Sequence, residues 1–254
     1  MYPEAKRWGG LLPMDLYRKM VDEAATKPII THLVLNGLGE PLLDPHLVER
    51  LEYAVRARPD WNIHFHTNGV YLTPDMFEKL KAAGLSFLSI SLNALDEPQH
   101  RRAMGLTDKF DIVCANAKYA IEHKDDMGIN VTAIADEKNF TIDHAKKFLK
   151  RWGDYRMDGY GKCISIGNWS GDIESSREFK PNECCIRAIT QIYVTYDGKV
   201  TTCCFDPTGK MTFGNVNDQS IADIYNSEAY VKFREDHSND MADLYDICKG
   251  CTRI

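Results

Sequence analysis

The chain has 254 residues, enough for one large domain or for a domain with a small module. Its 44% hydrophobic and 27% charged content is typical of a globular protein with a proper core. A net charge of −6 argues against nucleic-acid binding driven by phosphate neutralisation. No secretory signal is visible at Met1 and no segment approaches the roughly 18 apolar residues that span a bilayer, so we expect a cytoplasmic protein without membrane contact.

Strands and helices alternate over the first two thirds of the chain. Leu16, Met20, Val21 and Ala24 recur at helical spacing, and the segment that follows reads as a buried strand. The same criteria predict strands at 29–35, 61–66, 85–92, 129–134 and 163–168, with helices at 74–83, 110–123 and 141–152 between them.

This alternation predicts parallel strands joined by right-handed crossovers, in a barrel-like or an open α/β sheet. Ligands in either architecture bind at the carboxyl ends of the strands, so the segments directly after each strand are where function is expected.

Gly37, Gly39 and Glu40 follow the first strand in this way. Glycines let a backbone approach a ligand closely and a carboxylate can accept from an ammonium group, although glycine-rich strand ends are often simple turns.

Two further strands carry polar residues on one face. His64 and His66 share a face, which we interpret as hydrogen-bonding residues of the barrel interior in preference to a metal site. Ser89, Ser91 and Asn93 line one face of the next strand, where they either contact a polar ligand or satisfy interior groups.

The character of the chain changes near residue 171, which predicts two domains, 1–170 and 171–254. Asp197-Gly198 between two β-rich runs predicts a type I′ hairpin, which would fold Cys203 back toward the entry of the chain from Cys185. Ser220 is expected to cap a helix through Tyr225.

Eight cysteines in a chain with no visible secretory signal indicate metal or redox chemistry. Cys114 lies in a helical pattern and is expected to be a buried, inert thiol. Cys184 and Cys204 are expected to be neighbours of the ligands or substitutes for them. The remaining set can converge on one tetrahedral zinc or one iron–sulfur cluster: Cys185, Cys203, Cys248 and Cys251.

The chain resembles the radical S-adenosylmethionine (SAM) enzymes that carry a C-terminal SPASM or twitch module. The segments that carry the resemblance are Leu35–Leu43 (similar to the family's GGEP segment), His66–Gly69 (TNG), Ser89–Asn93 (SISL), Cys185-x12-Gly198-x4-Cys203, Phe213–Val216 and Ser220–Tyr225.

The resemblance implies a partial (β/α) barrel lacking its first strand, followed by a small hairpin-plus-helix, cysteine-rich SPASM/twitch module. It implies an oxidoreductase that modifies a peptide, the favoured substrate class, or a small molecule, with a flavodoxin- or ferredoxin-type reductant. The implied cofactors are SAM, held by Gly37, Gly39 and Glu40 with Ser91 and Asn93 as weaker candidates, and one auxiliary [4Fe-4S] cluster on the four cysteines.

The sequence departs from the family pattern because no cysteine precedes Cys114, so the C-x3-C-x2-C of the radical-generating cluster is absent. We interpret the chain as an N-terminally shortened form, with a second [4Fe-4S] cluster only if the missing segment exists. The alternative is a non-catalytic iron–sulfur or zinc-binding module derived from the family.

Overall fold

The computed structural model describes residues 10–37, 39–135, 141–153, 161–165, 185–206, 208–249 and 251. They form two compact units: residues 28–165 make the first, while residues 10–27 join residues 185–251 in the second, with the gaps just given. Helix α1 (Met14–Ala25) therefore belongs with the C-terminal part of the chain. The division into domains at residue 171 remains a proposal.

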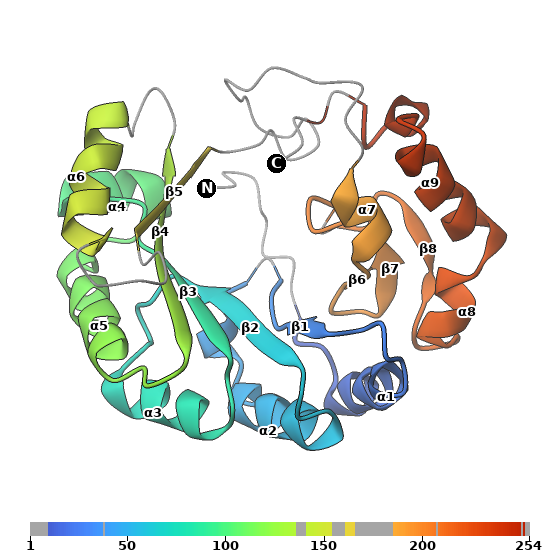
Figure 1. Cartoon of the computed structure of the whole chain (residues 1–254), viewed down its shortest axis with the longest axis horizontal. Coiled ribbons are helices and arrows are strands. Elements are labelled where there is room, and N and C mark those ends of the chain that lie inside the picture. Colours follow the sequence, from blue (N-terminus) through green and yellow to red (C-terminus); the bar gives the residue numbers. More distant parts are fainter. Residues whose placement is uncertain are drawn as a thin grey trace. The chain divides into compact units, whose positions relative to one another are not determined.

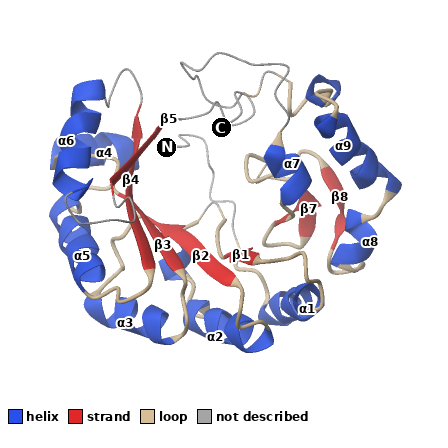
Figure 2. Cartoon of the chain, viewed as in Figure 1, coloured by secondary structure: helices blue, strands red, loops and turns tan. Residues whose placement is uncertain are grey.

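The first unit is built on one parallel sheet (Figures 1 and 2). Helices lie along one face of this sheet, as the strand–helix alternation predicts. The fold class, an α/β partial barrel, is therefore confirmed. The strands run in the order β1 (His32–Val34), β2 (Asn62–Thr67), β3 (Phe87–Ser91), β4 (Gly128–Ala135) and β5 (Gly161–Ser165), and the helices are α2 (Leu47–Ala57), α3 (Pro74–Ala82), α4 (Glu97–Met104), α5 (Phe110–Glu122) and α6 (Ile142–Gly153).

Alternation along the strands gives the sheet two different faces. Ile63 and Phe65 of β2 are fully buried, as are Leu88 and Ile90 of β3. Because successive side chains point to opposite faces, the residues between them lie on the other face. That face carries polar groups from neighbouring strands, with His66 in register with Ser89 and Ser89 in register with Asn130.

Strand β1 is shorter and more exposed than the sequence suggests. It covers three residues, Ile29 before it is 87% exposed, and Val34 is 46% exposed. The prediction of a buried strand over 29–35 is therefore wrong in length and burial. Within the described part of the chain β1 is an edge strand that pairs with β2 alone, which explains the exposure. Residues 166–168 of the predicted fifth strand lie outside the described residues.

The second unit combines a small antiparallel sheet with short helices. Its core contains Leu16 from α1, Val200, Ile224 and the aromatic rings of Tyr230 and Phe233. The elements are α7 (Ile186–Thr190), β6 (Tyr193–Val194), β7 (Lys199–Thr201), β8 (Thr212–Asn215), α8 (Ile221–Tyr225), α9 (Glu228–Ser238) and the 3-10 helix η3 (Ala242–Leu244).

The predicted hairpin forms, with a different turn. Thr195 N donates to Lys199 O at 2.9 Å and Gly198 N donates to Thr195 O at 2.9 Å, which leaves a three-residue loop. Gly198 has a φ of +87°, whereas Asp197 is not among the residues with positive φ. A type I′ turn needs both central residues there, so that expectation is wrong. A three-residue loop that ends in a left-handed glycine is the next most common hairpin connection.

One acidic and one basic side chain of helix α1 bond to other segments of this unit. The Glu23 carboxylate accepts from the backbone N–H groups of Ile221 and Ala222, each at 2.8 Å, at the start of α8. Lys19 Nζ donates to Val216 O at 2.5 Å. Ser220, as predicted, caps α8 by accepting from Asp223 N at 2.9 Å. Helix α1 therefore supplies partners for backbone groups that the C-terminal residues do not satisfy themselves.

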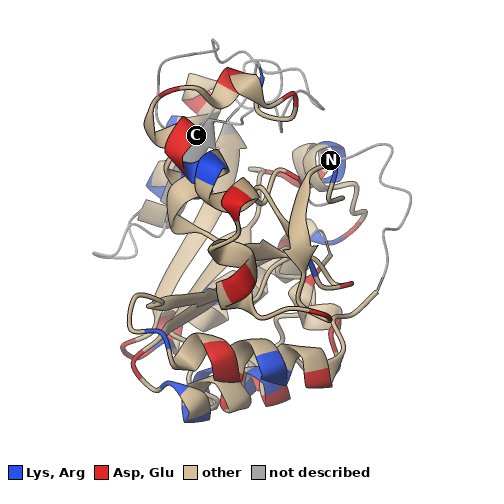
Figure 3. Ribbon diagram, turned by 90° about the vertical axis from the view of Figure 1, so that its right-hand side faces the viewer, with Lys and Arg blue, Asp and Glu red and all other residues tan. Residues whose placement is uncertain are grey.

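Acidic and basic residues alternate along the helices in Figure 3, in keeping with the modest net charge. Lys146, Lys147, Lys150 and Arg151 form an exposed basic group on α6. Among the described residues, no helix combines the length and apolar character needed to cross a bilayer.

Candidate functional site

The second unit contains a pocket lined by four cysteines from three separate segments. Cys185 is the N-cap residue of α7, and Cys203 follows β7. Cys248 and Cys251 lie in consecutive turns after η3, where Cys248 N donates to Tyr245 O at 2.8 Å and Cys251 N to Cys248 O at 3.1 Å. We call this the cysteine pocket; its described lining is Cys185, Arg187, Thr202, Cys203, Phe205, His237, Cys248 and Cys251.

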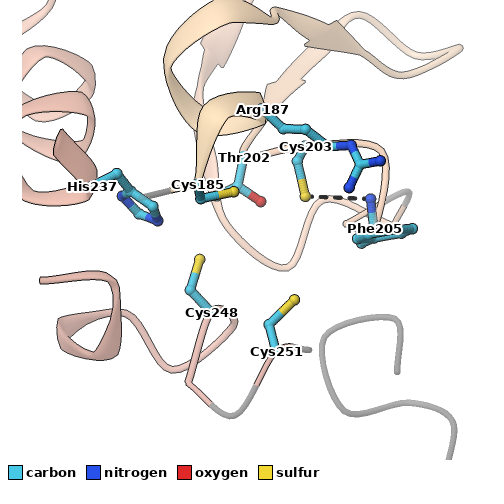
Figure 4. Close-up of a pocket in the computed structure, with 8 residues that line it drawn as sticks. All are labelled: Cys185, Arg187, Thr202, Cys203, Phe205, His237, Cys248 and Cys251. Atoms are coloured by element: carbon cyan, nitrogen blue, oxygen red, sulfur yellow. Dashed lines mark hydrogen bonds between the residues drawn. The ribbon is translucent and has the colours of Figure 1, made fainter. Parts of the chain in front are cut away.

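The four Sγ atoms point into a common space (Figure 4). None of these cysteines is in a disulfide. Within the described residues, no group of three or more His, Cys, Asp or Glu side chains is arranged to hold a metal ion as it stands. The fit to a cofactor therefore rests on the donor set, since four thiols around one space are the ligands that a [4Fe-4S] cluster requires.

The structure distinguishes the two members of the Cys203-Cys204 pair. Cys203 lines the pocket, whereas Cys204 is not part of the lining. The backbone N–H of Phe205 donates to Cys203 Sγ at 3.4 Å, which orients that sulfur (Figure 4). The preference for Cys203 over Cys204 as the ligand stays a prediction. Cys184 lies outside the described residues.

Burial is the main influence on the pKa of the Cys203 thiol. It raises the pKa of Cys203 to about 12, with the neighbouring Cys204, Cys185 and Cys251 adding to the effect. It also raises the pKa of Cys204, an effect that the positive charge of Arg187 opposes. The Cys203 thiol is protonated at neutral pH, so binding of iron to this sulfur must displace its proton.

Four lining residues were not identified from the sequence: Arg187, Thr202, Phe205 and His237. Arg187 lies two residues after Cys185, and its guanidinium carbon is 5.0 Å from the centroid of the Phe205 ring. His237 is 1% exposed and its Nδ1 lies 2.7 Å from Phe233 O. Proximity to a cysteine in sequence is the only signal for Arg187, and nothing in the sequence marks His237.

The second predicted site, after β1, lies in the first unit. The Glu40 carboxylate accepts from Thr67 Oγ1 at 2.5 Å and from Asn68 N at 2.7 Å, and it also accepts from Leu42 N at 3.1 Å. Glu40 therefore joins the loop after β1 to the turn after β2. Gly37 and Gly39 have open space where a Cβ would be, so the backbone there is accessible.

Asn36 makes a second link between the same segments. Its Oδ1 accepts from His66 N at 2.9 Å, and its Nδ2 donates to His66 O at 3.5 Å. Side-chain bonds to backbone groups thus hold the segments Leu35–Leu43 and His66–Gly69 together. These segments lie some 30 residues apart in the sequence.

Ser91 and Asn93 lie at the end of β3, at the same edge of the sheet. Asn93 has a φ of +56°, and its Oδ1 accepts from Ile134 N at 2.8 Å. Its Nδ2 donates to the sulfur of Met104 at 3.0 Å. The Asn93 amide thus ties β3 to the end of β4, while Ser91 is half-buried in register with Thr132.

The histidines of β2 form a cluster with a third from β1. The rings of His32 and His64 are 6.2 Å apart in an edge-to-face arrangement, and His64 packs in the same way on Phe87. Burial lowers the pKa of His64, with smaller contributions from the nearby His66 and His32. His64 Nδ1 lies 3.2 Å from Asn62 Oδ1. His64 is half-buried and His66 is exposed, so the interpretation of both as interior residues stays a prediction.

Two family models match this chain. Residues 1–149 match the model described as the radical SAM superfamily. Residues 184–252 match SPASM, described as an iron-sulfur cluster-binding domain. The second match contains all four cysteines of the cysteine pocket, and the first contains the Glu40–Thr67 link.

Curated relatives align over nearly the whole chain. The tungsten-containing aldehyde ferredoxin oxidoreductase cofactor-modifying protein of Pyrococcus furiosus is 22% identical over 290 residues, covering 96% of this chain and 80% of the relative. The S-adenosyl-L-methionine-dependent 2-deoxy-scyllo-inosamine dehydrogenase of Niallia circulans is 24% identical, covering 96% and 82%.

Solved structures share the fold. BtrN in complex with AdoMet and 2-DOIA superimposes with a TM-score of 0.70 at 19% identity, covering 98% of this chain and 83% of BtrN. Native anSMEcpe with bound AdoMet and the Kp18Cys peptide gives 0.68 at 16% identity, covering 100% and 84%.

Proposed function

Because the chain belongs to the radical SAM superfamily, we propose that it is an oxidoreductase that uses SAM and one auxiliary [4Fe-4S] cluster. Members of this family carry [4Fe-4S] clusters, and the chain also matches an iron-sulfur cluster-binding domain. The first cysteine in the sequence is Cys114, so the proposal concerns the SAM-binding loops and the auxiliary cluster, to which the described residues contribute.

The observation that carries the proposal is the cysteine pocket. Cys185, Cys203, Cys248 and Cys251 are the proposed ligands, and their sulfur atoms surround one space. The cluster would supply electron transfer. The Phe205 N–H is directed at Cys203 Sγ, an interaction of the kind that would tune the potential of an iron–sulfur cluster held there.

The loops at the carboxyl ends of β1 and β2 are the proposed site for the methionine end of SAM. Gly37 and Gly39 offer an open backbone, and Glu40 holds the loop by its bonds to Thr67 and Asn68. Ser91 and Asn93 remain weaker candidates for the same ligand, since the Asn93 amide already bonds to Ile134 and Met104.

The substrate class has support from both relatives and structure. The relatives from Pyrococcus furiosus and Niallia circulans are named for a cofactor and for an aminocyclitol, whereas a peptide is bound to anSMEcpe. We favour a small polar molecule, because the sheet face opposite the helices carries hydrogen-bonding side chains. These are His64, His66, Ser89 and Asn130. The electron donor would be a flavodoxin- or ferredoxin-type protein.

The proposal is tested by anaerobic reconstitution with iron and sulfide. We expect absorbance near ~400 nm and about four irons per chain from the cysteine pocket, because four thiolates ligate one [4Fe-4S] cluster. Cys251→Ser should abolish this signal, and Cys114→Ser is the matched control, since Cys114 is buried in the first unit. If the protein is colourless and holds one zinc per chain, the iron–sulfur assignment is wrong and the cysteine pocket is a structural zinc site.

A further inference from the structure

The cysteine pocket has one fixed positive charge among its described lining residues. Arg187 supplies it with its guanidinium group. The other polar lining residues are the four cysteines, Thr202 and His237, and none of them carries a permanent charge. A cluster bound by four thiolates is itself an anion, so the charge of Arg187 lies next to the charge that changes during electron transfer.

Arg187 is held in this position by its surroundings. It belongs to the first turn of α7, directly after the N-cap position that Cys185 occupies. Its guanidinium carbon lies 5.0 Å from the centroid of the Phe205 ring, a cation–π distance. The backbone N–H of the same Phe205 donates to Cys203 Sγ at 3.4 Å, so Phe205 positions both the cation and a proposed ligand (Figure 4).

We propose that Arg187 raises the reduction potential of the auxiliary cluster by holding its guanidinium charge in the lining of the cysteine pocket. One-electron reduction adds a negative charge to the cluster and neither forms nor breaks a bond. A fixed cation nearby stabilises that reduced state more than the oxidised state. Arg187 is half-buried, so solvent screens its charge less than that of a surface arginine.

The inference rests on the proposed function and makes it more specific. A cluster whose reduced form is stabilised accepts an electron more readily. Such a cluster suits a reaction that removes electrons from the substrate, which is an oxidation and not a rearrangement. Arg187 is in this view a positioning residue for the cluster and makes no contact with SAM or substrate.

The test is a potentiometric titration of the reconstituted full chain under anaerobic conditions, with dithionite as reductant and electron paramagnetic resonance of the reduced cluster as readout. Arg187→Gln should lower the equilibrium constant for cluster reduction about tenfold, equivalent to about 59 mV for one electron. Arg187→Lys should keep the wild-type value, because it preserves the charge. Arg234→Gln is the matched control, because Arg234 stacks on Tyr225 at 3.7 Å outside the pocket lining.

An unchanged potential in cluster-loaded Arg187→Gln would overturn the inference and leave the proposed function intact. If Arg187→Gln loses its iron, the potential of the cluster in Arg187→Lys is the deciding measurement. A wild-type potential in Arg187→Lys supports the charge effect. A tenfold lower equilibrium constant for cluster reduction in Arg187→Lys overturns it. Failure of the wild-type chain to bind any cluster would instead overturn the proposed function. The iron content measured beside each titration therefore separates the two failures.

Discussion

The hydroxyl of Thr67 donates a 2.5 Å hydrogen bond to Oε1 of Glu40, across 27 residues of sequence. The other carboxylate oxygen accepts from Asn68 N at 2.7 Å. One carboxylate thus fixes the loop after β1 against the turn after β2. Two motifs that look independent in the sequence are therefore one structural element at the carboxyl edge of the sheet.

Glu40→Gln should destabilise the first unit by about 1–3 kcal/mol, because an amide places its NH2 group where a carboxylate oxygen accepts a hydrogen bond. Thr67→Val should cost a similar amount by removing the hydroxyl donor. The double variant should lose less than the sum of the two, since both remove the same bond. Urea denaturation of the four proteins measures the coupling, and strict additivity would contradict the shared role.

Glu23→Gln should loosen the second unit although Glu23 lies almost 200 residues from its partners. The carboxylate accepts from two N–H groups at the start of α8, where negative charge is favoured by the helix dipole. We expect a loss of about 1–2 kcal/mol and faster amide hydrogen exchange in α8 and α9. The control is Glu235→Gln on the exposed face of α9. Equal exchange in both variants would show that α1 contributes nothing there.

Cys203→Ser should lose the reconstituted cluster, whereas Cys204→Ser should retain it. Cys203 lines the cysteine pocket and accepts from Phe205 N, but Cys204 is not part of that lining. Iron and acid-labile sulfide per chain are the measurements. Equal iron loss from both variants would mean that the adjacent thiols exchange as ligands.

Acid should destabilise the first unit through His100. This side chain is fully buried, and neither ring nitrogen has a hydrogen-bond partner among the described residues. Burial lowers its pKa below the ordinary value near 6.5, so the unfolded state binds the proton first. Stability is therefore full above pH 6.5 and falls as the pH drops below it, by at most about 1.4 kcal/mol per pH unit.

His100→Leu should flatten this part of the pH dependence, because leucine has no proton to bind. The measurement is the urea midpoint at pH 7.5 and at pH 5.5 for both proteins. The first unit of the variant should lose less stability than that of the wild type over this interval. An identical loss in the two proteins would assign the acid sensitivity to other groups.

Local sequence was sufficient to predict helices, caps and strands wherever these depend on short-range interactions. The helix capped by Thr73 forms, with Thr73 Oγ1 accepting from Met76 N at 3.2 Å, and Ser220 caps α8 as predicted. The alternation of strand and helix patterns located the four longest strands of the parallel sheet to within a few residues. The cysteine spacing also predicted which thiols would share a pocket.

The sequence by itself determined the α/β class and the family, because each depends on residue type and on spacing along the chain. Only the tertiary structure decided that α1 packs with the C-terminal unit, that Glu40 bonds to Thr67, and that Arg187 lies in the cysteine pocket. These relationships join residues through space, by burial of side chains and by partners for backbone groups. Their distance along the chain leaves no local pattern from which they can be predicted.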